Sequence, residues 1–111
     1  MITDLTYLTG MTGGSKEVMQ EMISIFIEQV GEISDSMDKA LLDKNYDNLS
    51  KLSHKAKASV SIMGMNDLAT KLKELEQNAA ELKEIETYPA YVDKFKNDCA
   101  IAIDELYSHI K

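Results

Sequence analysis

The feature that most constrains this chain is its scarcity of residues that break helices. Its 111 residues include one proline and five glycines. The strand-forming residues do not fall into alternating runs, whereas apolar side chains recur at three- and four-residue spacing, the repeat of one helix face. The pattern predicts an all-α protein, in which the few breakers mark the helix ends.

Five helices are predicted, over residues 4–9, 15–42, 46–63, 67–84 and 88–110. Ser15, Asn45 and Asn66 are candidate N-caps, because their side-chain oxygens can accept hydrogen bonds from the first backbone N–H groups of a helix. Gly64 follows the third helix, where a left-handed residue is wanted. Gly31 lies inside the second helix, where a bend or a close contact with a neighbour would explain it.

The connections between the four longer helices contain only a few residues. Short connections force sequential helices to run back alongside each other. The prediction is therefore an antiparallel up-down four-helix bundle with a short N-terminal helix, in one domain over residues 1–111. A chain of this length has no room for a second independent core. We expect it to act as a monomer.

Composition excludes several classes of function. The net charge of −7 and the pI of about 4.7 disfavour nucleic acid as a partner, since a phosphate backbone would be repelled. No apolar run approaches the ~20 residues that cross a bilayer, and the N-terminus lacks the pattern of a signal peptide. Cys99 is the single cysteine. A small buried thiol in a reducing compartment is the simplest interpretation, so we expect a cytoplasmic protein without membrane contact.

The helix predicted over residues 46–63 displays a histidine. A projection at about 100° per residue places an apolar stripe on one side, formed by Leu49, Leu52, Ala56, Val60 and Met63. His54 falls about 140° from Leu49, on the side facing solvent. Ser50, Lys57, Ala58 and Ser61 share that side with His54, and we call these five residues the histidine face. Small neighbours would let another protein approach the ring, and a lysine could stabilise a phosphoryl group.

Basic residues are concentrated around His54. Residues 44–57 contain Lys44, Lys51, Lys55 and Lys57 but only one acidic residue, Asp47, in a chain that is acidic overall. A lone surface histidine beside lysines is nevertheless commonplace. On these observations alone, the patch is either a functional site or a solvated helix face.

Other sites are not predicted from the remaining polar residues. Residues 43–47 resemble the start of a calcium loop, but Asn48 replaces the glycine that the turn needs. A di-metal carboxylate site would need two Glu-x-x-His pairs. Glu105 and His109, one helical turn apart, are interpreted as an exposed polar pair.

The segment His54-Lys55-Ala56-Lys57-Ala58-Ser59, followed by Met63-Gly64-Met65, resembles the signature of histidine-containing phosphotransfer (HPt) domains of bacterial phosphorelays. His54, Lys57, Ser59 and Gly64 match that signature by position. The likeness extends over essentially the whole chain and includes Asp4–Leu8, Thr12–Gly14, Phe26 and Asn45–Asp47. Ala58 departs from the pattern, since glycine is usual there, and its methyl group bears on the efficiency of transfer.

The resemblance implies a specific chemistry. His54 would accept a phosphoryl group from the aspartyl phosphate of a receiver domain and pass it to another receiver, with Lys57 supporting the phosphate. Ser50, Lys51, Lys55, Ala58 and Ser61 would contact the partner. The chain would need no cofactor, because the divalent metal would belong to the receiver.

The partners implied are response-regulator receiver domains and a hybrid sensor kinase. Autophosphorylation from ATP is not expected, since no nucleotide-binding loop is present. The alternative is a non-phosphorylated helical adaptor, which would use the same face to dock receivers or other helical proteins. Ala58 motivates that alternative.

Overall fold

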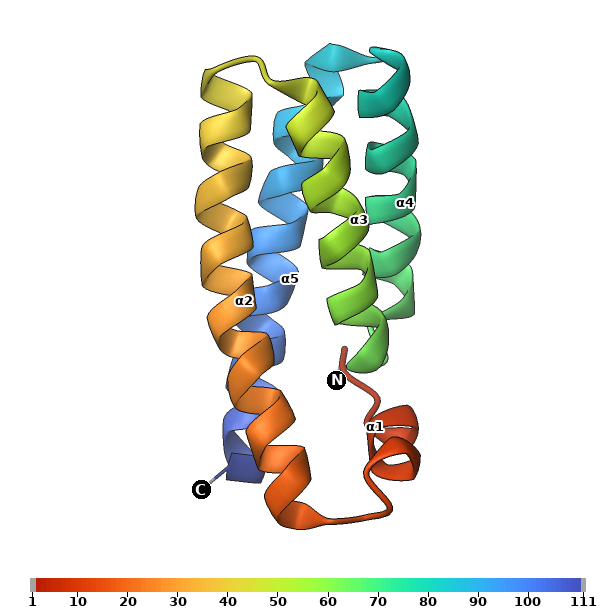
Figure 1. Cartoon of the computed structure of the whole chain (residues 1–111), viewed down its shortest axis with the longest axis vertical. Coiled ribbons are helices and arrows are strands. Elements are labelled where there is room, and N and C mark those ends of the chain that lie inside the picture. The colour runs from red at the N-terminus through yellow and green to blue at the C-terminus, as the bar shows by residue number, and fades with distance from the viewer. Residues whose placement is uncertain (1, 111) are drawn as a thin grey trace.

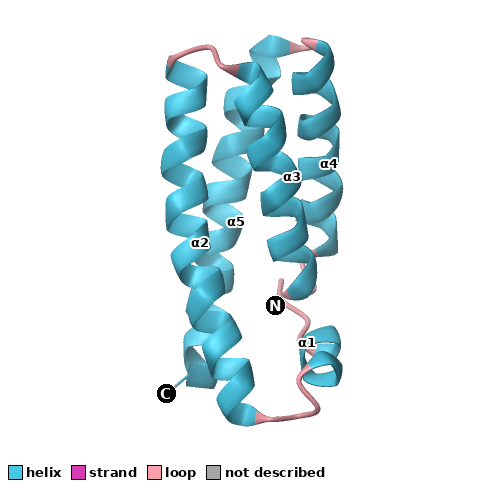
Figure 2. Cartoon of the chain, in the orientation of Figure 1, coloured by secondary structure: helices cyan, strands magenta, loops and turns pink. Residues whose placement is uncertain are grey.

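The computed structural model describes residues 2–110, and the side chains of residues 2–108. Five α-helices are present: α1 (Thr6–Met11), α2 (Lys16–Leu42), α3 (Tyr46–Ile62), α4 (Asn66–Glu81) and α5 (Tyr88–Ile110). A 3₁₀ turn, η1 (Ile85–Thr87), precedes α5. No strand occurs in this part of the chain, as Figure 2 shows, so the predicted all-α class is confirmed.

The four long helices pack around a common core. Helix α3 contacts α2 and α4, and α5 contacts the same two helices from the other side. The colours of Figure 1 show that each long helix runs opposite to the one before it, and that α1 lies beyond the C-terminal end of α3. The body is elongated, about 42 × 20 × 20 Å. One end of α3 therefore lies next to the N-terminal segment.

The core consists of one apolar stripe from each helix. On α3, Leu49, Ala56, Val60 and the following Met63 are buried, and Leu52 is partly buried against them. Cys99 is completely buried, as predicted. Val18 shares the apolar spacing of the α2 stripe but is exposed, because it lies in the first turn of α2, at the end of that helix.

The predicted caps are confirmed at two of three positions. The Ser15 Oγ accepts from the backbone N–H of Val18, and the Asn45 Oδ1 accepts from that of Asn48. The Asn66 cap is wrong: Asn66 is the first residue of α4, and Met65 precedes it without a side-chain cap. The chain leaves the left-handed conformation of Gly64 (φ +73°) and enters the helix sooner than expected.

Helix boundaries differ from the prediction by more than one residue in α1 and α4. The first helix spans Thr6–Met11 rather than residues 4–9, because Gly10 continues it. Helix α4 ends at Glu81 rather than at residue 84, and Leu82, which continues the apolar spacing of that helix, has φ +57° and is exposed. That left-handed turn lets the N–H of Lys83 bond to the carbonyl of Asn78 and turns the Leu82 side chain off the stripe.

Gly31 does not mark a close approach of helices. A Cβ built on it would meet nothing within 4 Å, and α2 continues through it. The residue is exposed, so a close contact with a neighbouring helix does not explain its presence.

The N-terminal segment is fastened across the turn between α3 and α4. The Glu105 carboxylate accepts from the N–H of Ile2 (3.0 Å), and from the N–H (3.1 Å) and the hydroxyl (2.7 Å) of Thr3. The Asp4 N–H donates to the carbonyl of Met63, and Gly64 lies directly against Asp4. Together these contacts, which we call the N-terminal clip, hold α1 beside the end of α3.

The expected Glu105–His109 pair falls partly outside the described residues, because the side chain of His109 is not among them. Glu105 itself faces the N-terminal segment and belongs to the N-terminal clip. Burial raises the pKa of Glu105, but the hydrogen bonds from Ile2 and Thr3 outweigh it, so the pKa is lower than usual.

None of the helices within residues 2–110 combines the length and apolar character needed to cross a bilayer.

Candidate functional site

His54 lies midway along α3 with 66% of its side chain exposed. Its Nδ1 is 3.3 Å from Oε1 and 3.2 Å from Oε2 of Glu76, which lies on α4. A carboxylate can only accept hydrogen bonds, so the Nδ1 carries the hydrogen in this contact. In the neutral ring, the remaining nitrogen, Nε2, then holds the lone pair.

Glu76 serves two donors at once. Its Oε1, 3.3 Å from the Nδ1 of His54, is also 3.1 Å from the Nζ of Lys57. The Glu76 side chain is 27% exposed, so the carboxylate is largely sheltered by the two helices. One acidic group thus orients the imidazole and pairs with the lysine one turn further along α3.

Lys57 lies differently from the prediction. The projection placed it on the solvent side with His54, whereas its side chain is only 28% exposed and turns toward α4. The reason is the partner that the sequence did not reveal: a half-sheltered carboxylate on the next helix attracts the ammonium group. Lys57 is therefore paired when no phosphoryl group is present.

The alignment of α3 with α4 is fixed by a further contact. The hydroxyl of Ser50 donates to the backbone carbonyl of Glu76 at 2.9 Å. Ser50, His54 and Lys57 are spaced so that all three reach the same residue of α4. Ser50 is consequently half-buried and acts on the helix pairing, in addition to any contact with a partner.

The remaining predicted residues of the site are exposed on α3. Lys51 pairs with Asp47 at 3.2 Å, and Lys55 has no ion-pair partner in the described part of the chain. The Ser61 hydroxyl donates to the carbonyl of Lys57 at 2.7 Å, so it is folded back on its own helix. Ala58 presents only a methyl group, so its side chain does little to obstruct a partner that approaches His54.

Sequence reasoning missed Glu76. It lies beside the apolar stripe of α4, among several acidic residues of that helix, and no motif distinguishes it. Its proximity to His54 depends on how two helices align across 22 residues of sequence. Only the packing of α3 on α4 supplies that information.

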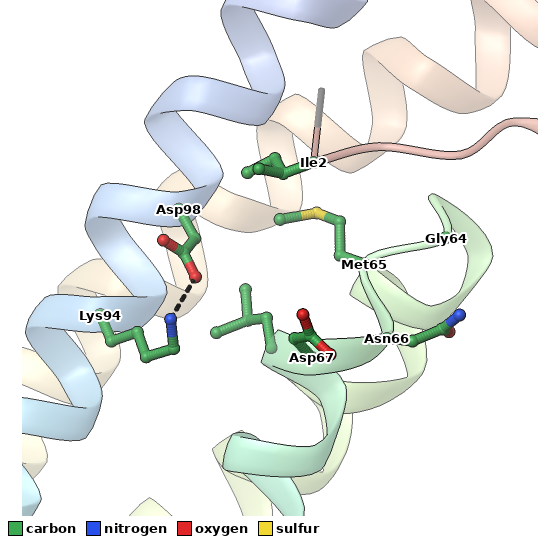
Figure 3. Close-up of a pocket in the computed structure, with 8 residues that line it drawn as sticks. Ile2, Gly64, Met65, Asn66, Asp67, Lys94 and Asp98 are labelled. Atoms are coloured by element: carbon green, nitrogen blue, oxygen red, sulfur yellow. Dashed lines mark hydrogen bonds and ion pairs between the residues drawn. The ribbon is translucent and has the colours of Figure 1, made fainter.

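Two hollows border the turn that contains Gly64. One, of about 430 Å³, is shown in Figure 3; Ile2 and Met65 lie on one side and Lys94 on another. None of the predicted site residues lines it, and the Nζ of Lys94 is already 2.9 Å from Asp98. The other, of about 750 Å³, lies between α1 and the C-terminal half of α3, and Ala58 and Ser61 line it. The second hollow is therefore the one that adjoins the histidine face.

No cluster of three or more His, Cys, Asp or Glu side chains suited to a metal ion occurs among the side chains that the structure describes.

Fold and site together define a class of protein: a helical module that displays one histidine, backed by a carboxylate and a lysine. The family model of the Hpt domain matches residues 21–110. The chain belongs to the Hpt domain family, whose members carry out histidine phosphotransfer in phosphorelays with receiver domains. Neither the curated proteins nor the solved structures gave a match to the chain.

Proposed function

We propose that this chain is a phosphorelay intermediate in which His54 accepts a phosphoryl group from a receiver aspartyl phosphate and passes it to a second receiver. The observation that carries the proposal is the exposed imidazole whose Nδ1–H is held by Glu76. That arrangement leaves the Nε2 lone pair free to attack phosphorus, so the nucleophile needs no separate general base.

The step is balanced without any proton leaving the ring. The Nε2 lone pair forms a bond to phosphorus while the bond between phosphorus and the receiver carboxylate oxygen breaks, and that carboxylate leaves as an anion. The ring then carries a positive charge with its hydrogen still on Nδ1. The Glu76 carboxylate, at 3.2 Å, stabilises this cation. In the reverse step a receiver aspartate attacks phosphorus and the ring becomes neutral again.

Lys57 supplies positive charge for the incoming phosphoryl oxygens. Its ammonium exchanges one carboxylate oxygen of Glu76 for a phosphoryl oxygen, which costs little because both are charge-assisted contacts. A divalent metal, held by the receiver, would screen the remaining phosphate charge. The chain itself contributes position and local charge and needs no cofactor.

The arrangement of the helices, the partners and the cellular location are part of the same proposal. The four long helices form an antiparallel up-down bundle that carries the histidine on a rigid rod, as the directions in Figure 1 support. The protein acts as a monomer with response-regulator receivers and a hybrid sensor kinase. The buried, lone Cys99 fits a cytoplasmic location, where thiols stay reduced.

The deciding experiment incubates the protein with radiolabelled, phosphorylated receiver domains. The wild type should acquire an acid-labile, base-stable phosphoryl adduct, with phosphorus bonded to Nε2 by NMR. His54→Gln should abolish the adduct, while His109→Gln, which alters the second histidine of the sequence, should retain it.

An adduct that persists in His54→Gln would place the phosphoryl group on another residue. Equal receiver binding by the wild type and His54→Ala, with no adduct from any donor, would instead establish the helical adaptor.

A further inference from the structure

Ser50 lies one turn before His54 on α3, and its hydroxyl reaches across to α4. It donates to the backbone carbonyl of Glu76 at 2.9 Å, a well-formed hydrogen bond. The bond ends on the main chain of α4, which the helix holds in place, and not on a mobile side-chain atom. Ser50 therefore fixes the position of Glu76 relative to α3.

The contact that depends on this position is a long one. The Nδ1 of His54 is 3.3 Å from Oε1 and 3.2 Å from Oε2 of Glu76. Charge-assisted N–H···O bonds are typically about 2.7–2.9 Å long, and a separation of about 3.6 Å is no longer a hydrogen bond. A displacement of α4 by a few tenths of an ångström thus decides whether the imidazole keeps its acceptor.

Lys57 competes with the imidazole for the same carboxylate. Its Nζ is 3.1 Å from Oε1 of Glu76, which is closer than the Nδ1 of His54 comes to either oxygen. The four-carbon stem of a lysine follows a carboxylate that moves, whereas an imidazole turns about only two side-chain torsions. A shift of α4 would therefore preserve the ion pair with Lys57 and break the contact with His54.

The loss of that contact has a chemical consequence, because a neutral imidazole has two tautomers. With the hydrogen on Nδ1, the Nε2 of His54 holds the lone pair that forms the bond to phosphorus. With the hydrogen on Nε2, that lone pair is absent and the ring cannot attack through this atom. The Glu76 carboxylate, which can only accept, selects the first tautomer.

From these contacts we infer that Ser50 is a positioning residue for phosphotransfer: its bond to the main chain of α4 holds the Glu76 carboxylate level with the His54 ring. This inference rests on the proposed function and deepens it. Ser50 touches none of the reacting atoms and acts only through Glu76.

The test compares two serines of α3. Ser50→Ala removes the hydroxyl that reaches α4, and Ser50→Thr retains a hydroxyl at that place. Ser53→Ala is the matched control, because the buried Ser53 hydroxyl donates at 2.8 Å to the carbonyl of Leu49 on its own helix. Nitrogen NMR of labelled protein reports the tautomer of His54 at about pH 8, above the ordinary pKa of histidine. The His54 signals are assigned by their loss in His54→Gln.

The wild type, Ser53→Ala and Ser50→Thr should carry the hydrogen on Nδ1 of His54. Ser50→Ala should shift the ring toward the other tautomer and slow single-turnover transfer from a phosphorylated receiver about threefold, since fewer rings hold the Nε2 lone pair. The receiver is chosen from a purified panel for activity on the wild type. Labelling by phosphoramidate, a small phosphoryl donor that does not dock, should slow by the same factor.

A double variant tests whether Ser50 acts through Glu76. Glu76→Ala removes the carboxylate but keeps the backbone carbonyl, so adding Ser50→Ala should change neither the tautomer nor the rate further. Equal slowing by Ser50→Ala in both backgrounds would overturn the inference. So would slower receiver transfer with unchanged tautomer and phosphoramidate labelling, since Ser50 would then contact the receiver.

Failure of the proposed function is recognised separately. If no donor labels His54, the proposed function fails, while the tautomers of Ser50→Ala and Ser53→Ala still show whether Ser50 positions Glu76. Identical tautomers in these two variants would overturn the inference.

Discussion

The α3–α4 pair and the α2–α5 pair each contain a lysine–carboxylate contact between helices, yet the two contacts differ in kind. Lys57 lies 3.1 Å from Glu76, and Lys96 lies 3.0 Å from Asp38. The first pair is 28% and 27% exposed, the second 39% and 50%. Glu76 also accepts from His54, whereas Asp38 accepts only from Lys96 among the side chains that the structure describes. The face that carries His54 is therefore distinguished by the burial of its carboxylate and by the two donors that meet there, rather than by the presence of an ion pair.

The physical reason lies in solvent screening. An exposed ion pair gains little because water screens both charges and the side chains lose entropy. A half-sheltered carboxylate keeps a stronger field and needs donors, so it orients whatever donors surround it. The α3–α4 face therefore holds a positioned imidazole, while the α2–α5 face holds an ordinary surface contact. Matched residues on the two faces should therefore respond differently to the same substitution.

The largest difference should come from two glycines. Gly64, after α3, has φ +73°, and an added Cβ would overlap the backbone carbonyl of Asp4 and lie 2.6 Å from its Cβ. Gly31, on α2, has nothing within 4 Å. Gly64→Ala should destabilise the fold by about 3 kcal/mol, because it combines left-handed strain with displacement of the N-terminal segment.

Gly31→Ala is the matched control and should stabilise the fold by up to ~1 kcal/mol through helix propensity. Urea unfolding monitored by circular dichroism measures both. Similar midpoints for Gly64→Ala and the wild type would mean that the clip does not hold Asp4 against the turn.

The sequence predicted the helices well because their information is local. Apolar spacing located the stripe on α3, and the side chains of Ser15 and Asn45 cap the helices where expected. The exposure of His54 also followed from local spacing, since the opposite side of α3 is buried. Its role in phosphotransfer was suggested by the motif and stays a prediction.

The contacts that shape the site could not be predicted, because they join distant segments. Glu76 meets His54 across 22 residues, and Glu105 meets Thr3 across 102. Local spacing says which side of a helix a residue occupies but not which residue of the next helix it faces. The inward turn of Lys57 is the consequence: its direction is set by Glu76, not by its own helix.

Glu76→Gln and Asp38→Asn each remove the negative charge of one interhelical carboxylate at nearly constant side-chain shape. Glu76→Gln should slow phosphoryl transfer to His54 about tenfold, since a neutral amide stabilises the cationic phosphorylated ring less than a carboxylate does. Asp38→Asn should leave transfer unchanged. Single-turnover transfer from a phosphorylated receiver measures both. A faster Glu76→Gln variant would show that the carboxylate mainly restrains Lys57.

A smaller effect is expected from the two lysines. Lys57→Ala should slow transfer about fivefold, the equivalent of ~1 kcal/mol for a charge-assisted contact that is partly screened. Lys96→Ala should not alter the rate. Both variants should unfold within a few tenths of a kcal/mol of the wild type, as urea titration can show. A collapse in the stability of Lys57→Ala would assign this lysine to the fold.

The smallest effect concerns the pH dependence of the α2–α5 pair. The hydrogen bond and the charge of Asp38 raise the pKa of Lys96. A raised folded-state pKa stabilises the fold below the ordinary lysine pKa, and this contribution is lost as the pH rises through the raised value. The wild type should therefore exceed Asp38→Asn slightly in urea midpoint at pH 8, and the two midpoints should converge once the pH has risen through the raised pKa of Lys96. A difference that persists there would mean that Asp38 stabilises α2 by a route other than Lys96.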